Sequence, residues 1–195
     1  GRPYRERLNG NWGVMDVQDC IDGAQYLIDL GRVDPRRIAI RGRSSGGFTV
    51  LNALASSNVF TAGASFSGIA DLAKLAETSH KFESHYDGIL LGTFDRSDPV
   101  WTQRSPINRV AEITAHLLLL QGTADPVVPA SQAQEMYEAL RANGSAVALK
   151  LYEGEGHRFR SAVNIKDALL SELAFYRTVW GIDTDNPIHV EIANL

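Results

Sequence analysis

Short apolar runs alternate with longer amphipathic runs along the 195 residues of this chain. Runs that are brief and rich in apolar or small residues predict strands at 37–40, 61–68, 116–122 and 146–157. Runs with apolar residues every three or four positions, or with small residues throughout, predict helices at 14–31, 46–57, 129–144 and 162–181. This alternation predicts an α/β fold with about four parallel strands, flanked by helices and joined by right-handed crossovers.

Two stretches add detail to this picture. The run HLLLLQG at 116–122 is apolar on both faces, which is typical of a central parallel strand covered by helices on each side. Residues 71–112 break the alternation and are rich in aromatic and turn-forming residues. In an open α/β sheet, such an excursion tends to lie over the carboxyl ends of the strands, where ligands bind.

Composition and charge exclude several classes of protein. A net charge of −4 without a block of like charges predicts neither a nucleic-acid groove nor a membrane-surface patch. No apolar run reaches membrane-spanning length, and no secretory signal opens the chain. The single cysteine, Cys20, excludes an internal disulfide and favours a reducing, cytoplasmic compartment. Cys20 falls mid-helix, where we expect it to pack in the core.

The segment GRSSG at 42–46 matches the pattern G-x-S-x-G, with a predicted strand before it and a predicted helix after it. Glycine and serine are common in turns, so the pentapeptide alone is weak, and the context carries the interpretation. Only Ser44 has glycine two residues away on both sides, whereas Ser45 is flanked by Arg43 and Gly47. We therefore predict that Ser44 is a nucleophile at a strained turn. The N–H of Ser45 is then expected to be an oxyanion donor at the N-terminus of the following helix.

A nucleophilic serine needs a base and an orienting acid, which follow later strands in the order Ser, Asp, His on this kind of fold. Asp125 stands in the loop after the strand at 116–122, and His157 ends the strand segment at 146–157. Both residues fall where that chemistry requires them. The predicted catalytic residues are Ser44, Asp125 and His157.

Other titratable residues are weaker candidates. His116 precedes its strand and should lie at the opposite end of the sheet. Asp71 follows the second strand and is the main rival acid, but we expect it to cap the helix that begins at LAKLAE. Glu153 and Glu155 lie on the strand and loop of His157 itself, which makes them poor orienting partners. His80 and His85 match no recognised zinc spacing, and His189 lies in the tail. Asp16, Asp19 and Asp22 line one helix without forming a metal site, and we expect them to form a solvated face. The Ser-Asp-His mechanism implies no metal and no organic cofactor.

Several motifs together resemble the catalytic domain of the prolyl oligopeptidase family, in its acylaminoacyl peptidase and dipeptidyl aminopeptidase-like branch. They are IRGRSSGGFTVLNAL, HKFES, RSPINRV, LLLLQGTADPVVPASQAQEMYEAL and YEGEGHRF. The resemblance covers nearly the whole chain, from residue 1 to about 182. It implies a serine peptidase with Ser44 as nucleophile, Asp125 as acid and His157 as base, and a pocket for the residue before the scissile bond lined by Ile69.

The chain also departs from the pattern of that family. Arg43 and Arg158 stand where glycine is usual, and each is expected to place bulk and positive charge near the site. The resemblance puts a second oxyanion donor upstream of GRPYRERLNGNWG, in a part that this chain does not contain. We therefore expect weak activity from this chain even if the three catalytic residues assemble.

The family fold is an eight-stranded α/β-hydrolase sheet, usually preceded by a β-propeller, whereas four strands are predicted here. The chain thus resembles the C-terminal half of one catalytic domain, 1–195, without its upstream strands. It begins without Met, as a processed N-terminus or a fragment would. The edge of the 37–40 strand should be open, and an open apolar edge favours association. We therefore expect the chain either to form a homo-oligomer through that edge or to be ordered by another chain.

Three functional hypotheses remain from the sequence. The first is a serine peptidase acting on peptide substrates through an acyl-enzyme. The second is an α/β-hydrolase carboxylesterase, which HKFES and RSPINRV disfavour. The third is a catalytically silent fragment that acts only in assembly, and the four-strand count supports it for this chain.

Overall fold

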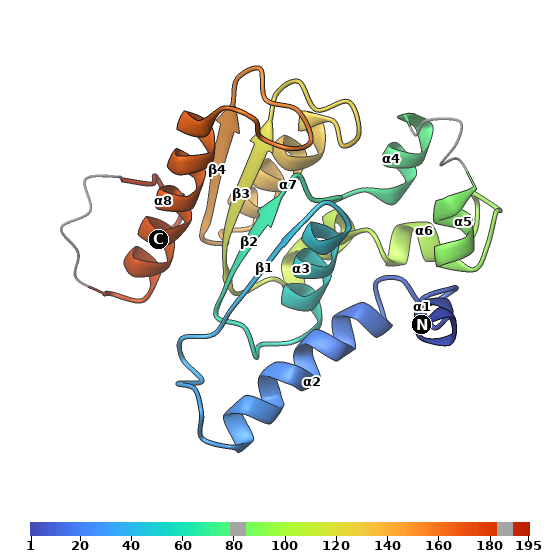
Figure 1. The fold of residues 1–195 in the computed structure, drawn as a ribbon, viewed down its shortest axis with the longest axis horizontal. Coiled ribbons are helices and arrows are strands. Elements are labelled where there is room, and N and C mark those ends of the chain that lie inside the picture. Colours follow the sequence, from blue (N-terminus) through green and yellow to red (C-terminus); the bar gives the residue numbers. More distant parts are fainter. Residues whose placement is uncertain (79–84, 183–188) are drawn as a thin grey trace.

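The computed structural model describes residues 1–78, 85–182 and 189–195. At its centre lies a parallel sheet in the order β1-β2-β3-β4, with helices on both faces (Figure 1). The strands are β1 (Ala39–Arg43), β2 (Ala62–Phe66), β3 (His116–Gly122) and β4 (Val147–Tyr152). The predicted α/β class with four parallel strands is confirmed. The HKFES motif at 80–84 lies outside the described residues.

The strand register brings the carboxyl ends of the strands to one edge of the sheet. Arg43, the last residue of β1, pairs with Phe66 at the end of β2. Gly122, the last residue of β3, pairs with Tyr152 at the end of β4. In a parallel sheet, the loops that follow such ends share one edge, so Ser44, Asp125 and His157 come from neighbouring loops.

Helices α2 (Met15–Asp29), α3 (Ser45–Ser56) and α7 (Ala130–Ala142) cover one face of the sheet, and α8 (Ala162–Val179) covers the other (Figure 1). The leucines of β3 serve the two faces alternately. Leu117 and Leu119 pack in the core with α2, α3 and α7, whereas Leu118 and Leu120 pack in the core with α8. The prediction of a strand that is apolar on both faces is therefore confirmed, as a consequence of the two helical layers.

The excursion at 71–112 forms a third layer beside the sheet, together with the start of the chain (Figure 1). Its elements are α1 (Arg2–Glu6), α4 (Leu72–Thr78), α5 (Tyr86–Leu91) and α6 (Val100–Gln103). The 3-10 helix η1 (Pro106–Glu112), at the end of this segment, packs instead mainly against α3 and α7. A separate hydrophobic cluster joins this layer to α3 and to the loops that follow β2 and β3, and it contains Trp12, Phe48 and Val128. Because Phe48 follows β1 and Val128 follows β3, the layer lies near the carboxyl ends, as expected. Helix α1 was not predicted.

Strand β1 differs from the prediction in its bounds. It was expected at 37–40 but begins at Ala39 and continues to Arg43. The N–H of Arg37 donates to Asp34 in a turn, which delays the strand. The strand can contain charged residues because it lies at the edge of the sheet, where Arg41 forms an ion pair with Glu172.

Helix α2 is less buried than its apolar spacing suggests. Val17 and Ala24 are buried, but Tyr26 and Leu30 are exposed. Cys20 is also exposed, so the prediction that it packs in the core is wrong. The helix contacts α3 along a narrow stripe, and residues away from that stripe face solvent.

The two sheet edges differ in the part of the chain that the structure describes. β1 pairs with β2 alone, so its outer edge is open, as expected. The C-terminal tail bridges Ala193 to Val147 and covers part of the β4 edge. Self-association through β1 stays a prediction. Among residues 1–78, 85–182 and 189–195, no helix combines the length and apolarity needed to cross a bilayer.

Candidate active site

Ser44 forms the turn between β1 and α3 in a strained backbone conformation. Its φ of 57° and ψ of −122° lie where non-glycine residues are rare. Two hydrogen bonds hold the turn, since the Ser44 N–H donates to the Phe66 carbonyl at 2.9 Å and the Phe48 N–H donates to the Ser44 carbonyl at 3.0 Å. This is the sharp strand-to-helix turn that the G-x-S-x-G pattern predicts.

The glycines in and next to the motif differ in whether the structure requires them to lack a side chain. A Cβ at Gly42 would lie 2.3 Å from the carbonyl oxygen of Gly46, so a side chain there is excluded. A Cβ at Gly46 would meet nothing within 4 Å, so the expectation that both flanking positions must lack a side chain is right for Gly42 alone. Gly47 is needed as well, because its Cβ would lie 2.6 Å from the Cα of Gly68. The turn is therefore packed tightly on its β1 and β2 sides.

Asp125 and His157 form a direct pair. The imidazole Nδ1 of His157 lies 2.8 Å from Asp125 Oδ2. Asp125 Oδ1 accepts the N–H groups of Val127 and Val128 at 2.9 Å each, and Gln121 Nε2 donates to Oδ2 at 3.2 Å. The carboxyl group is thus fully engaged, with a side-chain exposure of 0%.

These contacts set the charge of Asp125. Burial alone would raise the pKa of this carboxyl group, but the hydrogen bonds from His157, Val128 and Val127 outweigh burial and hold the pKa below its ordinary value. Asp125 is therefore ionised at neutral pH and suited to accept from the protonated Nδ1 of His157. That arrangement leaves Nε2 of His157 for other chemistry.

Glu155 organises the loop that carries His157. Its carboxylate accepts the N–H groups of Arg160 at 2.7 Å and Ser161 at 2.9 Å, and Asn164 Nδ2 donates to it at 2.8 Å. The Arg160 hydrogen bond is the main reason that the pKa of Glu155 is lowered. Its backbone carbonyl also accepts the N–H of Ala124 at 2.9 Å, which ties the two loops together. Glu155 is not the partner of the imidazole, as expected, and this supporting role was not predicted.

Four of the predicted residues line one cavity of about 430 Å³. Ser44, Ser45, His157 and Ile69 all line it. In the described part of the chain, the Ser44 hydroxyl makes no hydrogen bond to the imidazole. We call this space the Ser44 cavity; its other walls are Leu8, Trp12, Leu75, Tyr86, Asp87, Leu90, Pro126, Val127 and Val128. The binding role of Ile69 stays a prediction.

Ser45 is the first residue of α3. Its backbone N–H has no hydrogen-bond partner among the described residues, which leaves it available to an incoming oxygen. Its side chain is engaged, since Trp12 Nε1 donates to Ser45 Oγ at 3.0 Å. Trp12 was not singled out from the sequence.

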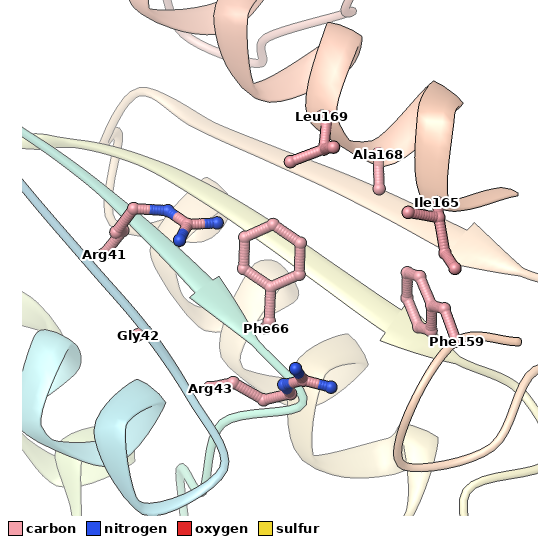
Figure 2. A pocket seen from close by; sticks show the side chains of 8 residues that line it. All are labelled: Arg41, Gly42, Arg43, Phe66, Phe159, Ile165, Ala168 and Leu169. Carbon is pink, nitrogen blue, oxygen red and sulfur yellow. The ribbon is translucent and has the colours of Figure 1, made fainter. Parts of the chain in front are cut away.

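The two arginines that depart from the family pattern lie in different places. Arg43 lines a second cavity of about 280 Å³ between β1 and α8, beside Phe66 and Phe159 (Figure 2). Its side chain is therefore not among the walls of the Ser44 cavity. Arg158 lines a hollow that it shares with His157 and Arg160.

The rival residues lie away from the Ser44 cavity or bind other groups. Asp71 Oδ1 accepts the N–H of Lys74 at 3.1 Å and caps α4, as predicted. His116 begins β3, at the opposite end of the sheet, and burial lowers its pKa. Asp16 is not simply solvated, because it accepts the N–H of Gly13 at 2.7 Å and the hydroxyl of Thr49. His85 and His189 are exposed, and His80 falls outside the described residues. Among the residues described, no three His, Cys, Asp or Glu side chains are grouped to hold a metal ion.

Comparison with known proteins now adds to this geometry. The sequence profile of the prolyl oligopeptidase family matches residues 1–183. The chain belongs to the prolyl oligopeptidase family. A relative in this family, dipeptidyl aminopeptidase BIII of Pseudoxanthomonas mexicana, is 30% identical over 172 residues, which are 85% of this chain and 25% of that protein. Acylamino-acid-releasing enzyme 2 of Oryza sativa subsp. japonica is 27% identical over 183 residues, 85% of this chain and 24% of that protein.

A solved structure of a Mycobacterium tuberculosis puromycin-hydrolyzing peptidase is similar throughout the chain. It has a TM-score of 0.93 and 43% sequence identity, and the match covers 97% of this chain and 29% of that one. The chain therefore spans about a quarter of the length of these family members, with matches that cover 24–29% of them. Its α/β fold is the fold of the matching segment of the solved structure.

Proposed function

We propose that this chain carries the catalytic residues of a serine peptidase, which hydrolyses peptide bonds through an acyl-enzyme on Ser44. One observation carries the proposal: Ser44 and His157 line the same cavity, while buried Asp125 binds the far nitrogen of His157. Membership of a peptidase family agrees with it. The roles of the three residues follow from the contact between Asp125 and Nδ1 of His157, which leaves Nε2 of His157 to act on Ser44.

In the first step, Nε2 of His157 takes the hydroxyl proton of Ser44 as Ser44 Oγ bonds to the substrate carbonyl carbon. The proton then passes from His157 to the leaving nitrogen, and the C–N bond breaks to leave an ester on Ser44. A water molecule gives a proton to His157 and attacks this ester. The released Ser44 oxygen recovers the proton, so that an acid and an amine are the products. Asp125 keeps the imidazole in the required tautomer throughout.

The oxyanion that forms on the carbonyl needs donors that are already in place. The free N–H of Ser45 stands at the start of α3, where the helix dipole also favours negative charge. One such donor contributes about 10²- to 10³-fold in kcat.

The relatives suggest the substrate class. Their names describe enzymes that release acylated amino acids or dipeptides. We therefore propose short peptides as substrates, with the cleaved bond close to the N-terminus. The family relationship favours peptides over simple carboxylic esters.

The test is labelling of the whole chain with a fluorophosphonate, followed by mass spectrometry to locate the modified residue. The proposal predicts a label on Ser44 that Ser44→Ala abolishes and that the matched variant Ser45→Ala retains. Unlabelled protein from the same preparation is then given peptide-amide and ester substrates with the same acyl group. Turnover of the ester alone would make the chain a carboxylesterase. A folded chain without any label would be a silent fragment, and the proposal would be wrong.

A further inference from the structure

Trp12 lies in the loop between α1 and α2, in a position that the rest of the molecule determines closely. The indole is buried, with 3% of the residue exposed. The Trp12 N–H donates to the Leu90 carbonyl at 3.2 Å, and the Gly10 N–H donates to the Ile89 carbonyl at 3.0 Å. From the other side, the guanidinium of Arg104 donates to the carbonyls of Trp12 at 2.9 Å and Gly10 at 3.1 Å. The loop is therefore anchored to both α5 and the end of α6.

The indole contacts the first turn of α3 at two points. Its Nε1 donates to Ser45 Oγ at 3.0 Å, and its ring lies 4.4 Å from the ring of Phe48, measured between centroids. Ser45 and Phe48 are three residues apart and share one face of the helix. The indole thus holds the first turn of α3 in place. The residue immediately before this turn is Ser44, which has a strained backbone conformation. Such a conformation persists only where the surroundings determine it.

The same ring forms part of an apolar wall of the Ser44 cavity. Ile69, Leu75, Leu90 and Val128 complete that wall, and all four are buried. An apolar side chain next to the scissile carbonyl would gain free energy by leaving water for this wall. A charged side chain would lose its hydration there.

From these contacts we propose that Trp12 has two functions in the reaction of Ser44. As a positioning residue it fixes Ser45, and with it the oxyanion donor. As a specificity-determining residue it limits the size of an apolar side chain on the acyl side of the scissile bond. The inference rests on the proposed function, because it concerns the same cavity.

Four variants separate these roles. Trp12→Phe keeps an aromatic wall and removes the N–H donor, and Ser45→Ala removes the acceptor. Trp12→Ala opens the wall. Trp101→Phe is the matched control, because Trp101 is equally buried in the same cluster, does not line the cavity, and its Nε1 has no hydrogen-bond partner among the described residues.

The assay measures kcat and KM on peptide amides that carry Ala, Leu, Phe or Lys before the cleaved bond. We expect Trp12→Phe and Ser45→Ala each to lower kcat about three- to tenfold with little change in KM, since each removes one hydrogen bond. The double variant Trp12→Phe/Ser45→Ala should lose no more kcat than either single variant, because both substitutions remove the same hydrogen bond. Trp12→Ala should shift the preference from Leu toward Phe, and Trp101→Phe should match the parent chain.

Three results would overturn the inference. Additive losses in the double variant would mean that the hydrogen bond is not the shared cause. An unchanged preference in Trp12→Ala would remove the specificity function. A preference for Lys would mean that the Asp87 carboxylate, which also lines the cavity, selects the side chain.

Failure of the proposed function would look different. Without a fluorophosphonate label on Ser44 in the parent chain, the peptidase proposal fails, and the specificity function fails with it. The positioning function still has its own readout, the NMR signal of the Trp12 indole N–H. We expect that signal to move in Ser45→Ala and to stay in place in Trp101→Phe. An unmoved signal in Ser45→Ala would contradict the hydrogen bond.

Discussion

Replacement of Asp125 by Asn tests the orientation of His157 with little change in shape. The Asn oxygen can still accept the N–H groups of Val127 and Val128, which lie 2.9 Å from Oδ1 in the parent chain. Its amide nitrogen then faces Nδ1 of His157, which is 2.8 Å from Oδ2. A donor in that place holds the imidazole in the tautomer with its proton on Nε2, so that Nε2 cannot take the proton of Ser44.

The magnitude follows from that single change. A wrong tautomer in a triad of this kind lowers kcat by about 10⁴-fold, equivalent to about 5 kcal/mol of transition-state stabilisation. KM should change little, because Asp125 is buried and lies outside the walls of the Ser44 cavity. The assay is steady-state hydrolysis of a peptide amide, with thermal unfolding to show that the variant is folded.

The matched control is Asp71→Asn. Asp71 also follows a strand, and its carboxylate caps α4 by accepting the N–H of Lys74. The side-chain oxygen of Asn can accept the same N–H. Its activity should equal that of the parent chain. A kcat for Asp125→Asn within tenfold of the parent, or a comparable loss in Asp71→Asn, would refute the reasoning.

Three further predictions concern the surroundings of the site. In a urea titration, Gly42→Ala should lower the free energy of unfolding by about 2 kcal/mol or more, because its Cβ would lie 2.3 Å from a carbonyl oxygen, and it should abolish labelling of Ser44. Gly46→Ala should remain folded in the same titration, because its Cβ would meet nothing within 4 Å. The pKa of Glu155 is held below its ordinary 4.5, so its carboxylate contributes stability above pH 4.5 that is lost as the pH falls through the lowered value. When the melting temperature is followed against pH, Glu155→Gln should lack this part of the acid-induced loss of stability. Arg158→Gly should reduce the preference for an acidic residue after the cleaved bond by about two- to fivefold at low salt, and an equal preference in both chains would show that the exposed charge does not reach the substrate.

The parts of the site that follow strands could be predicted from the sequence. Strand ends are marked by changes from apolar to polar residues, and parallel strands put those ends at one edge. Asp125 and His157 were therefore predicted from their positions with respect to apolar runs, and Ser44 from the G-x-S-x-G pattern between a strand and a helix. The strain at Ser44 was also predictable, because the glycines around it signal a turn that side chains would obstruct.

The contacts between distant loops could not be predicted. Trp12 donates to Ser45 across 33 residues of sequence, and no local pattern encodes that distance. The available signal was a single large aromatic residue between Gly10 and Gly13, in an otherwise polar loop, since such a ring must be buried somewhere. The prediction that Cys20 is buried was wrong for a related reason. Helical spacing shows which residues share a face, but not how wide a stripe the neighbouring helix covers.

The most direct test of the account is to look for the acyl-enzyme itself. The chain is mixed with an activated ester that transfers an acyl group, quenched in acid within the first turnover, and its peptides are weighed by mass spectrometry. The account predicts one acyl group on Ser44 that is lost on longer incubation and that is absent in Ser44→Ala. Hydrolysis of the ester without any acylated Ser44, or acylation at Ser45, would contradict it.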